Sequence, residues 1–384
     1  MVRFIHTADW HLGRSFFGYS LLEDQAHALD RLVRLTAEEK CDVLLVAGDV
    51  FDRAVPPAEA VTLLDETLTR LVEEAGTRVV LIGGNHDSQR RLEFGSRLVD
   101  RGRLLLAGRL RLPLQPLRLR DRWGEVGIWP LPWTHPTQVR SLLGEETGEG
   151  GTSALAALVG TVTPGPRDVL VLHAFLRGGL PSESERPLGV GGEEQVSPEI
   201  CAPFAYTALG HLHRPQSVGG CANIRYSGSL LQYSFAEVGQ EKGVSRVEID
   251  GAGKVRVDHL PLPPRRPLAI LEGKLEELLA RAGTEGGGEG YTLARLTDRG
   301  PVLQAAERLR PHYPNLVHVE RAAGPGAEGS LFPVIDSRRA DTEELFRRFF
   351  HYATGAEMEA AEQDLLRRVL GRIEALPREE EARR

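Results

Sequence analysis

The chain has 384 residues, more than one ordinary domain, and its 41% hydrophobic content is enough for a sizeable core. It has no apolar run of about eighteen residues and opens directly into the strand-like VRFIHTAD, so neither a membrane span nor a secretory signal is expected. Its three scattered cysteines exclude a disulfide framework and predict a cytoplasmic protein, and its net charge of −7 argues mildly against nucleic acid unless a metal supplies local positive charge.

Strand-like and helix-like segments alternate over residues 1–264. Residues 21–40 carry apolar side chains at helical spacing, and Pro57 is suited to the first turn of a helix that ends at Ala75. The strand candidates among these segments are VRFIHTAD, CDVLLVAGD, TRVVLIGGNHD, RDVLVLHAF and AYTALGHLH. This alternation predicts a layered α/β domain.

The prolines of PLPPRRP, at residues 261–267, predict a domain boundary. Beyond it we expect a small α+β domain over residues 265–322, a glycine-rich linker over 323–340 and helices over 341–384. The helical tail has an apolar face with spacings of three and four, formed by Leu345, Phe346, Phe349, Phe350, Met358, Leu365, Leu366, Val369, Leu370, Ile373 and Leu376. That face packs either against the chain's own domains or in the groove of a partner.

Each of the five apolar strand candidates ends in polar residues. These are Asp9, His11, Asp49, Asn85, His86, Asp87, His173, His211 and His213. In an open α/β sheet the carboxyl ends of the strands gather at one edge, where ligands bind. Residues up to two hundred positions apart, such as Asp9 and His211, are therefore expected to line one crevice.

Seven of these residues are metal-ligand types that offer oxygen or imidazole nitrogen and no thiolate: Asp9, His11, Asp49, Asn85, His173, His211 and His213. Such donors suit Mn²⁺, Fe²⁺ or Zn²⁺. Seven side chains are too many for one ion with an open position, and they fit two ions about 3.5–4 Å apart that share a carboxylate. A single DxH or GD motif is more often a turn, so the ordered combination carries the prediction.

The order DxH, GDxxD, GNHD, H, GHxH resembles the calcineurin-like metallophosphoesterases. The stretches HTADWHLG, GDVFDRAVPPAEAV, GHLHRPQ, SGSLLQYSF with EKGV, and LRGGLPSESER are similar to the bacterial SbcD family. The resemblance implies an α/β fold: a layered metallophosphoesterase β-sandwich flanked by helices, with a small α+β capping domain and a C-terminal helical tail. It also implies a Mn²⁺-dependent DNA nuclease, with 3′→5′ exonuclease action on duplexes and endonuclease action on single strands or hairpins.

By the same resemblance, the protein is a homodimer that works in DNA end processing with an SbcC-like ATPase bound through the C-terminal helices. The first ion takes Asp9, His11, Asp49 and His213, and the second takes Asp49, Asn85, His173 and His211. His86 donates a proton to the leaving 3′ oxygen. Asp87 either supports His86 or caps the following helix. Asp52 replaces the histidine of many archaeal and eukaryotic relatives, and it either orients a ligand or caps a helix.

Five arginines near the ligands either hold DNA phosphates or are solvated surface residues: Arg14, Arg53, Arg90, Arg91 and Arg214. The loop Ser182 to Arg186 has no assigned role. One rival function is a small-molecule metallophosphoesterase, such as a cyclic-nucleotide phosphodiesterase, but that activity needs no C-terminal additions. A second rival is a non-catalytic scaffold subunit, which the complete ligand set argues against.

Overall fold

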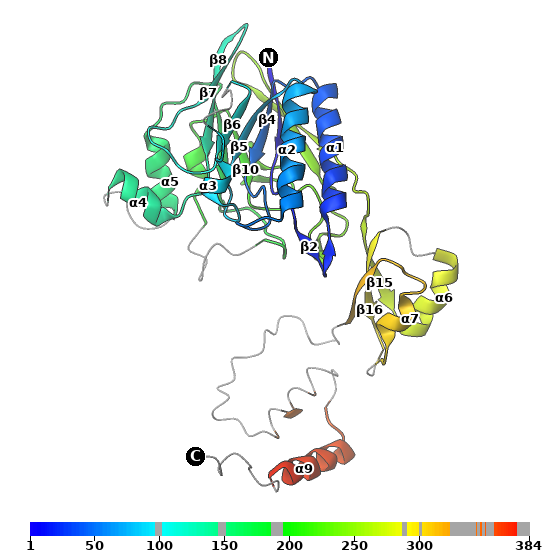
Figure 1. Ribbon diagram of the computed structural model, residues 1–384. Coiled ribbons are helices and arrows are strands. Elements are labelled where there is room, and N and C mark those ends of the chain that lie inside the picture. The colour runs from blue at the N-terminus through cyan, green and yellow to red at the C-terminus, as the bar shows by residue number, and fades with distance from the viewer. Residues whose placement is uncertain are drawn as a thin grey trace. The chain divides into compact units, whose positions relative to one another are not determined.

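The computed structural model describes residues 1–96, 102–144, 151–185, 195–285, 290–298, 302–322, 343, 346–347, 350 and 357–374. The chain divides into two compact units (Figure 1). One unit comprises Met1–Ala269 with Glu289–Tyr291, and the other comprises Ile270–Gly288 with Thr292–Arg384.

The first unit contains two six-stranded sheets. The first sheet has the order β14-β13-β1-β4-β5-β6, formed by Val255–Pro261, Gly243–Ile249, Val2–Thr7, Val43–Ala47, Arg78–Ile82 and Leu104–Ala107. The second sheet has the order β11-β12-β10-β9-β8-β7, formed by Gln216–Val218, Cys221–Tyr226, Tyr206–Gly210, Val169–His173, Gly124–Leu131 and Leu117–Asp121. Strands β1, β4, β5 and β6 run parallel, as do β8, β9, β10 and β12, so each group ends at one edge of its sheet.

The two sheets pack face to face around a shared apolar core. Val43 and Leu45 of β4 lie in the same core cluster as Val169 and Val171 of β9. Leu44 points to the opposite face of its sheet, because side chains alternate along a strand, and it is also fully buried. Burial on both faces explains why these strands read as unbroken apolar runs.

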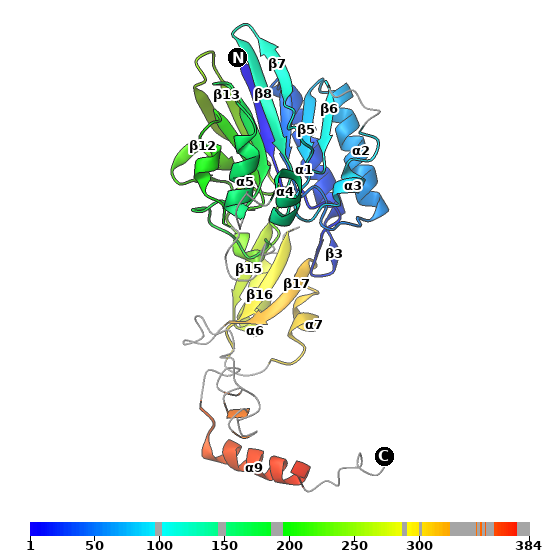
Figure 2. The same cartoon turned by 90° about the vertical axis from the view of Figure 1, so that its left-hand side faces the viewer.

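Helices cover the outer faces of both sheets. Helices α1 (Leu22–Glu38) and α2 (Ala58–Glu73) flank the first sheet, and α4 (Pro136–Leu143) and α5 (Gly151–Gly160) flank the second (Figures 1 and 2). The helix–sheet–sheet–helix arrangement confirms the predicted layered β-sandwich. Pro57 precedes α2 as its N-cap, in extended conformation, and so lies just outside the first turn in which it was expected.

The second unit contains a three-stranded sheet in the order β15-β16-β17, formed by Leu268–Gly273, Tyr291–Leu296 and Leu316–Arg321. Helices α6 (Leu275–Glu285) and α7 (Ala305–Leu309) contribute Leu278 and Leu309 to its core. The division of the chain after Ala269 falls inside β15. The predicted linker, residues 323–340, lies outside the described residues.

The C-terminal helix α9 spans Ala360–Glu374. Leu365 and Val369, one turn apart, expose 56% and 44% of their surface, whereas Leu366 is buried. The predicted tail residues Leu345, Phe349 and Leu376 lie outside the described residues. Among the helices of the described part, none combines the length and apolar character that crossing a membrane requires.

Candidate metal centre

The segments that follow β1 and β4 are joined by backbone hydrogen bonds. The amide of Asp9 donates to the carbonyl of Gly48 over 3.0 Å, and the amide of His11 donates to the carbonyl of Asp49 over 3.0 Å. Asp9, His11, Asp49 and His211 have positive φ angles of 54°, 45°, 48° and 110°. Left-handed backbone costs energy for residues other than glycine, and such strain clusters at functional sites. Four of the seven candidate ligands are thus held in strained conformations.

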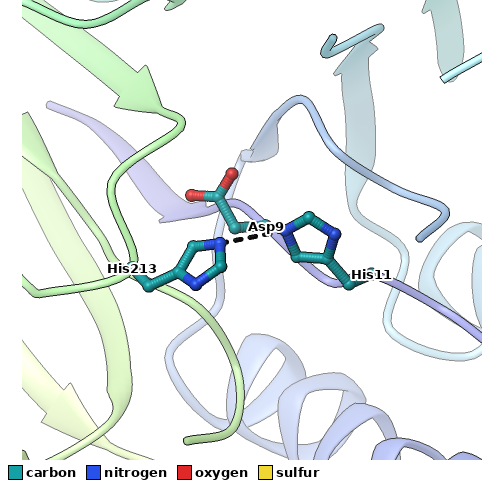
Figure 3. A group of neighbouring side chains, drawn as sticks. All are labelled: Asp9, His11 and His213. Carbon is teal, nitrogen blue, oxygen red and sulfur yellow. Dashed lines mark hydrogen bonds between the residues drawn. The ribbon is translucent and has the colours of Figure 1, made fainter. Parts of the chain in front are cut away.

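Asp9, His11 and His213 form the first ligand group (Figure 3). The Nε2 atoms of His11 and His213 face each other 3.0 Å apart, although the two residues are 202 positions apart in the chain. The Asp9 carboxylate accepts the backbone N–H of His211, with N–O distances of 2.9 and 3.1 Å. The candidate ligand atoms of this group all lie within 4.8 Å of one another.

Asp49, His173 and His211 form a second group, whose candidate ligand atoms also lie within 4.8 Å of one another. His173 Nε2 lies 3.5 Å from Asp49 Oδ2 and 2.9 Å from Asn85 Oδ1. Asp49 Oδ2 is also 3.8 Å from His11 Nε2 of the first group. The Asp49 carboxylate therefore lies between the two groups.

Burial sets the electrostatics of the centre. Burial and the nearby charge of Asp49 raise the pKa of Asp9 well above its usual range. Burial holds the pKa of His11 well below its usual range and lowers that of His211 to about 3. Neutral imidazoles keep a lone pair for coordination, and divalent cations would offset the repulsion between the two carboxylates. The residues present thus fit a site for hard or borderline metal ions.

His86 and Asp87 both make hydrogen bonds to the backbone near Asp49. His86 Nδ1 donates to the backbone carbonyl of Asp52 over 2.8 Å. The Asp87 carboxylate accepts the N–H groups of Val50, Phe51 and Gly84 over 3.0, 2.9 and 2.9 Å. Asp87 therefore stabilises the turn that follows Asp49. These three bonds differ from the two roles expected for Asp87, which were to support His86 or to cap the next helix.

His86 and Asp52 also belong to a third group of candidate ligand atoms, with His11. Asp52 Oδ1 lies 3.7 Å from His11 Nδ1, too far for a hydrogen bond. This nitrogen of His11 is buried and has no hydrogen-bond partner. Because His86 offers a ligand atom to this third group, the geometry allows a ligand role for His86 as well as the predicted proton-donor role.

Glycines admit the close contacts between the strand ends. A Cβ on Gly84 would lie 2.1 Å from Asp49 Oδ1, and one on Gly210 would lie 1.9 Å from the carbonyl oxygen of Ala47. Gly48 has a φ of +93°, and a Cβ there would lie 2.4 Å from His173 Nδ1. Glycine is required at these positions because any side chain would displace a candidate ligand or the backbone beside it.

Comparison with known proteins shows to which family the chain belongs. Its residues 2–214 match the calcineurin-like phosphoesterase family, and residues 264–354 match the family described as type 5 capsule protein repressor C-terminal domain. The SbcD subunit of the nuclease SbcCD from Staphylococcus epidermidis is 30% identical over 97% of this chain and 99% of that protein. The chain belongs to the SbcD family.

Two further proteins are similar to this family member. The SbcD subunit of the nuclease SbcCD from Staphylococcus saprophyticus is 31% identical over 96% of this chain and 98% of that protein. The crystal structure of a dimetal phosphatase from Danio rerio is 12% identical, with a TM-score of 0.40, and the match covers 67% of this chain and 98% of that one.

In this member of the SbcD family, the five arginines predicted near the ligands fall into two classes. Arg14 donates to the carbonyl of Ser184 over 3.2 Å and lies 4.8 Å from the ring centroid of Tyr233. Arg91 donates to the carbonyl of Ala54 over 2.9 Å. The side chains of Arg53, Arg90 and Arg214 are exposed, as is that of Arg91, whereas Arg14 is half-buried. DNA contact by any of the five stays a prediction.

Sequence reasoning missed a polar shell beside His213. Ser184 and Glu185 come from the loop that had no assigned role, and Glu237 and Lys242 come from the SGSLLQYSF and EKGV region. A signal was available for Glu237, which interrupts the apolar stretch of SFAEV, where a charge needs a partner, but not for Lys242, which lies in the polar segment GQEKG.

Proposed function

We propose that this chain is a two-metal phosphodiesterase that cleaves DNA as the nuclease subunit of an SbcCD-like complex. The observation that carries the proposal is the position of Asp49 between two compact ligand groups, in a chain of the SbcD family. Mn²⁺ is the proposed metal, because the resemblance to the SbcD family implies it and the oxygen and imidazole donors, which also suit Fe²⁺ and Zn²⁺, are compatible with it. The proposed activities are 3′→5′ exonuclease action on duplexes and endonuclease action on single strands or hairpins.

In the proposed mechanism, Asp49 would hold both ions. Asp9, His11 and His213 would complete the first ligand set, and Asn85, His173 and His211 would complete the second. When bound, the two cations supply activation of the attacking water and stabilisation of the charge that develops on the phosphate. Asp87 positions Asp49 by fixing the backbone of the turn that follows it.

His86 is proposed as the acid for the leaving 3′ oxygen. Its Nδ1 must carry a hydrogen, because its partner is a carbonyl oxygen, which only accepts. In the imidazolium form, Nε2 carries the second proton and is the atom that can transfer it. The hydrogen bond to the Asp52 carbonyl fixes the ring for this transfer.

We further propose that the C-terminal helices bind an SbcC-like ATPase and that the complex contains two copies of this chain. The exposed Leu365 and Val369 of α9 support a docking role. The sequence contains no P-loop motif, so ATP dependence requires such a partner.

A nuclease assay with titrated Mn²⁺ tests the proposal, with a duplex and a cyclic nucleotide as alternative substrates. We expect Mn²⁺-dependent cleavage of the duplex, stimulated by ATP when the ATPase is added. Turnover of the cyclic nucleotide with an inert duplex would favour a small-molecule phosphoesterase. The absence of hydrolysis of either substrate, with metal bound, would favour the scaffold role.

A further inference from the structure

A buried chain of polar side chains leads away from His213 on the side opposite its Nε2 atom. His213 Nδ1 is 2.5 Å from Ser184 Oγ, and that hydroxyl donates to Glu237 Oε1. Glu237 Oε2 lies 2.8 Å from the ammonium of Lys242. Glu237 is fully buried, Lys242 is 5% exposed and Ser184 is 9% exposed. Burying two charges and a hydroxyl is costly unless each has partners.

The hydrogen bonds around Glu237 determine where each proton lies. Glu237 accepts from Ser184 at Oε1, and from Lys242 and the Tyr233 amide at Oε2. A carboxylate with three donors around it, one of them an ammonium, is an ionised acceptor.

The single hydroxyl proton of Ser184 is therefore used toward Glu237. Ser184 Oγ can offer only a lone pair to His213, so His213 Nδ1 must carry the hydrogen of that contact. The neutral imidazole then has no hydrogen on Nε2. This is the nitrogen that faces His11 Nε2 at 3.0 Å in the first ligand group.

Three further contacts link the Ser182–Glu185 loop and Lys242 to the backbone of His213. Glu185 Oε1 accepts the backbone N–H of His213 over 2.7 Å, and Glu185 Oε2 accepts the N–H of Ser182 over 2.8 Å. Lys242 Nζ also donates to the backbone carbonyl of His213 over 2.6 Å. The Ser182–Glu185 loop and Lys242 are thus both hydrogen-bonded to the backbone of His213.

We propose that Ser184, Glu237 and Lys242 are positioning residues that fix His213 as its Nδ1–H tautomer and present the Nε2 lone pair to the first metal ion. This inference rests on the proposed function, because it assumes that His213 is a ligand. It gives a role to the Ser182–Glu185 loop and to the charges of the SFAEV and EKGV segments.

Calorimetric titration of the metal-free full chain with Mn²⁺ tests the inference. Ser184→Ala should weaken the first-ion affinity by roughly 10–100-fold, as loss of a ligand's orienting partner does, and should spare the second site. Ser184→Thr keeps the hydroxyl and should restore most of the affinity. Ser245→Ala removes another buried hydroxyl, from β13, and this variant should bind both ions normally.

The tautomer is measured separately, by long-range ¹H–¹⁵N NMR of the metal-free protein, with His213 assigned by the loss of its signals in His213→Ala. The wild-type ring should carry its hydrogen on Nδ1, and Ser184→Ala should give a mixture of tautomers. An Nε2–H ring in the wild type, or wild-type affinity in a folded Ser184→Ala, would overturn the inference alone. First-ion binding unaffected by His213→Ala would overturn the proposed ligand set, and the inference with it.

Discussion

At the scale of single residues, Asp49 is the side chain on which the candidate centre depends most. Its carboxylate is 2% exposed, accepts the His86 amide over 2.9 Å and lies between the two ligand groups. Its positive φ shows that the backbone is strained at this position. A residue buried and strained in this way is expected to be needed for chemistry more than for stability.

Asp49→Asn is therefore expected to lose one or both metal ions and to cut nuclease activity by about 10²-fold or more, since metal stabilisation is worth several kcal/mol. The metal-free protein should still fold, because asparagine has nearly the same shape and its side-chain oxygen can still accept the His86 amide. Elemental analysis and calorimetry measure both effects. Asp65→Asn, on the exposed face of α2, is the control. Full Mn²⁺ stoichiometry with full activity would contradict the bridging role.

His86→Ala separates a proton donor from a ligand. Loss of a general acid should lower kcat by roughly 10²–10⁴-fold, with both metals still bound. The alternative is that His86 binds a metal ion together with His11 and Asp52, the other members of the third ligand group. A parallel drop in metal content, measured on the same samples, would reassign His86 as a ligand.

At the scale of elements, the carboxyl ends of the strands approach one another closely at glycines, where no side chain separates them. Gly84→Ala would place a Cβ 2.1 Å from Asp49 Oδ1 and 2.2 Å from the Asp49 amide nitrogen. We expect loss of metal binding and a destabilisation of about 1–3 kcal/mol, typical of overpacking.

Gly160→Ala provides the matched comparison for Gly84→Ala, because a Cβ at that end of α5 has no atom within 4 Å. It should leave both metal binding and stability near wild type. Denaturant unfolding with parallel Mn²⁺ titration measures the two variants together. Normal metal affinity in Gly84→Ala would contradict this expectation, because it would show that the turn at Asp49 can shift to accept a Cβ and still bind metal.

At the scale of the whole molecule, the tail and the metal centre are expected to act independently. The two core clusters that contain β4, β9 and β10 include no buried residue beyond Ile249 in the described part of the chain. Removal of residues 338–384 should leave Mn²⁺-dependent cleavage of a simple duplex near its full level. It should abolish co-purification with an SbcC-like ATPase, since the exposed Leu365 and Val369 are lost. Unfolding, metal loss or undiminished ATPase binding would each contradict this independence.

The sequence by itself determined the sandwich and the neighbourhood of the seven candidate ligands. The apolar runs before Asp9, Asp49 and His173 are buried strands. Parallel pairing brings Asp9 to Asp49 in one sheet and His173 to His211 in the other, and the packing of the two sheets brings the two pairs together. Strand burial follows from local composition, and the gathering of strand ends follows from parallel topology, so neither depends on details of side-chain packing.

Only the tertiary structure decided what surrounds those ligands. Asp87 binds the turn after Asp49, 37 positions away, and Ser184 links His213 to Glu237 across separations of 29 and 53 residues. No local propensity specifies such hydrogen bonds, because they depend on where loops from different strands come to lie. The strand ends follow general rules of sheet geometry, whereas the shell that orients the ligands depends on the particular path of each loop.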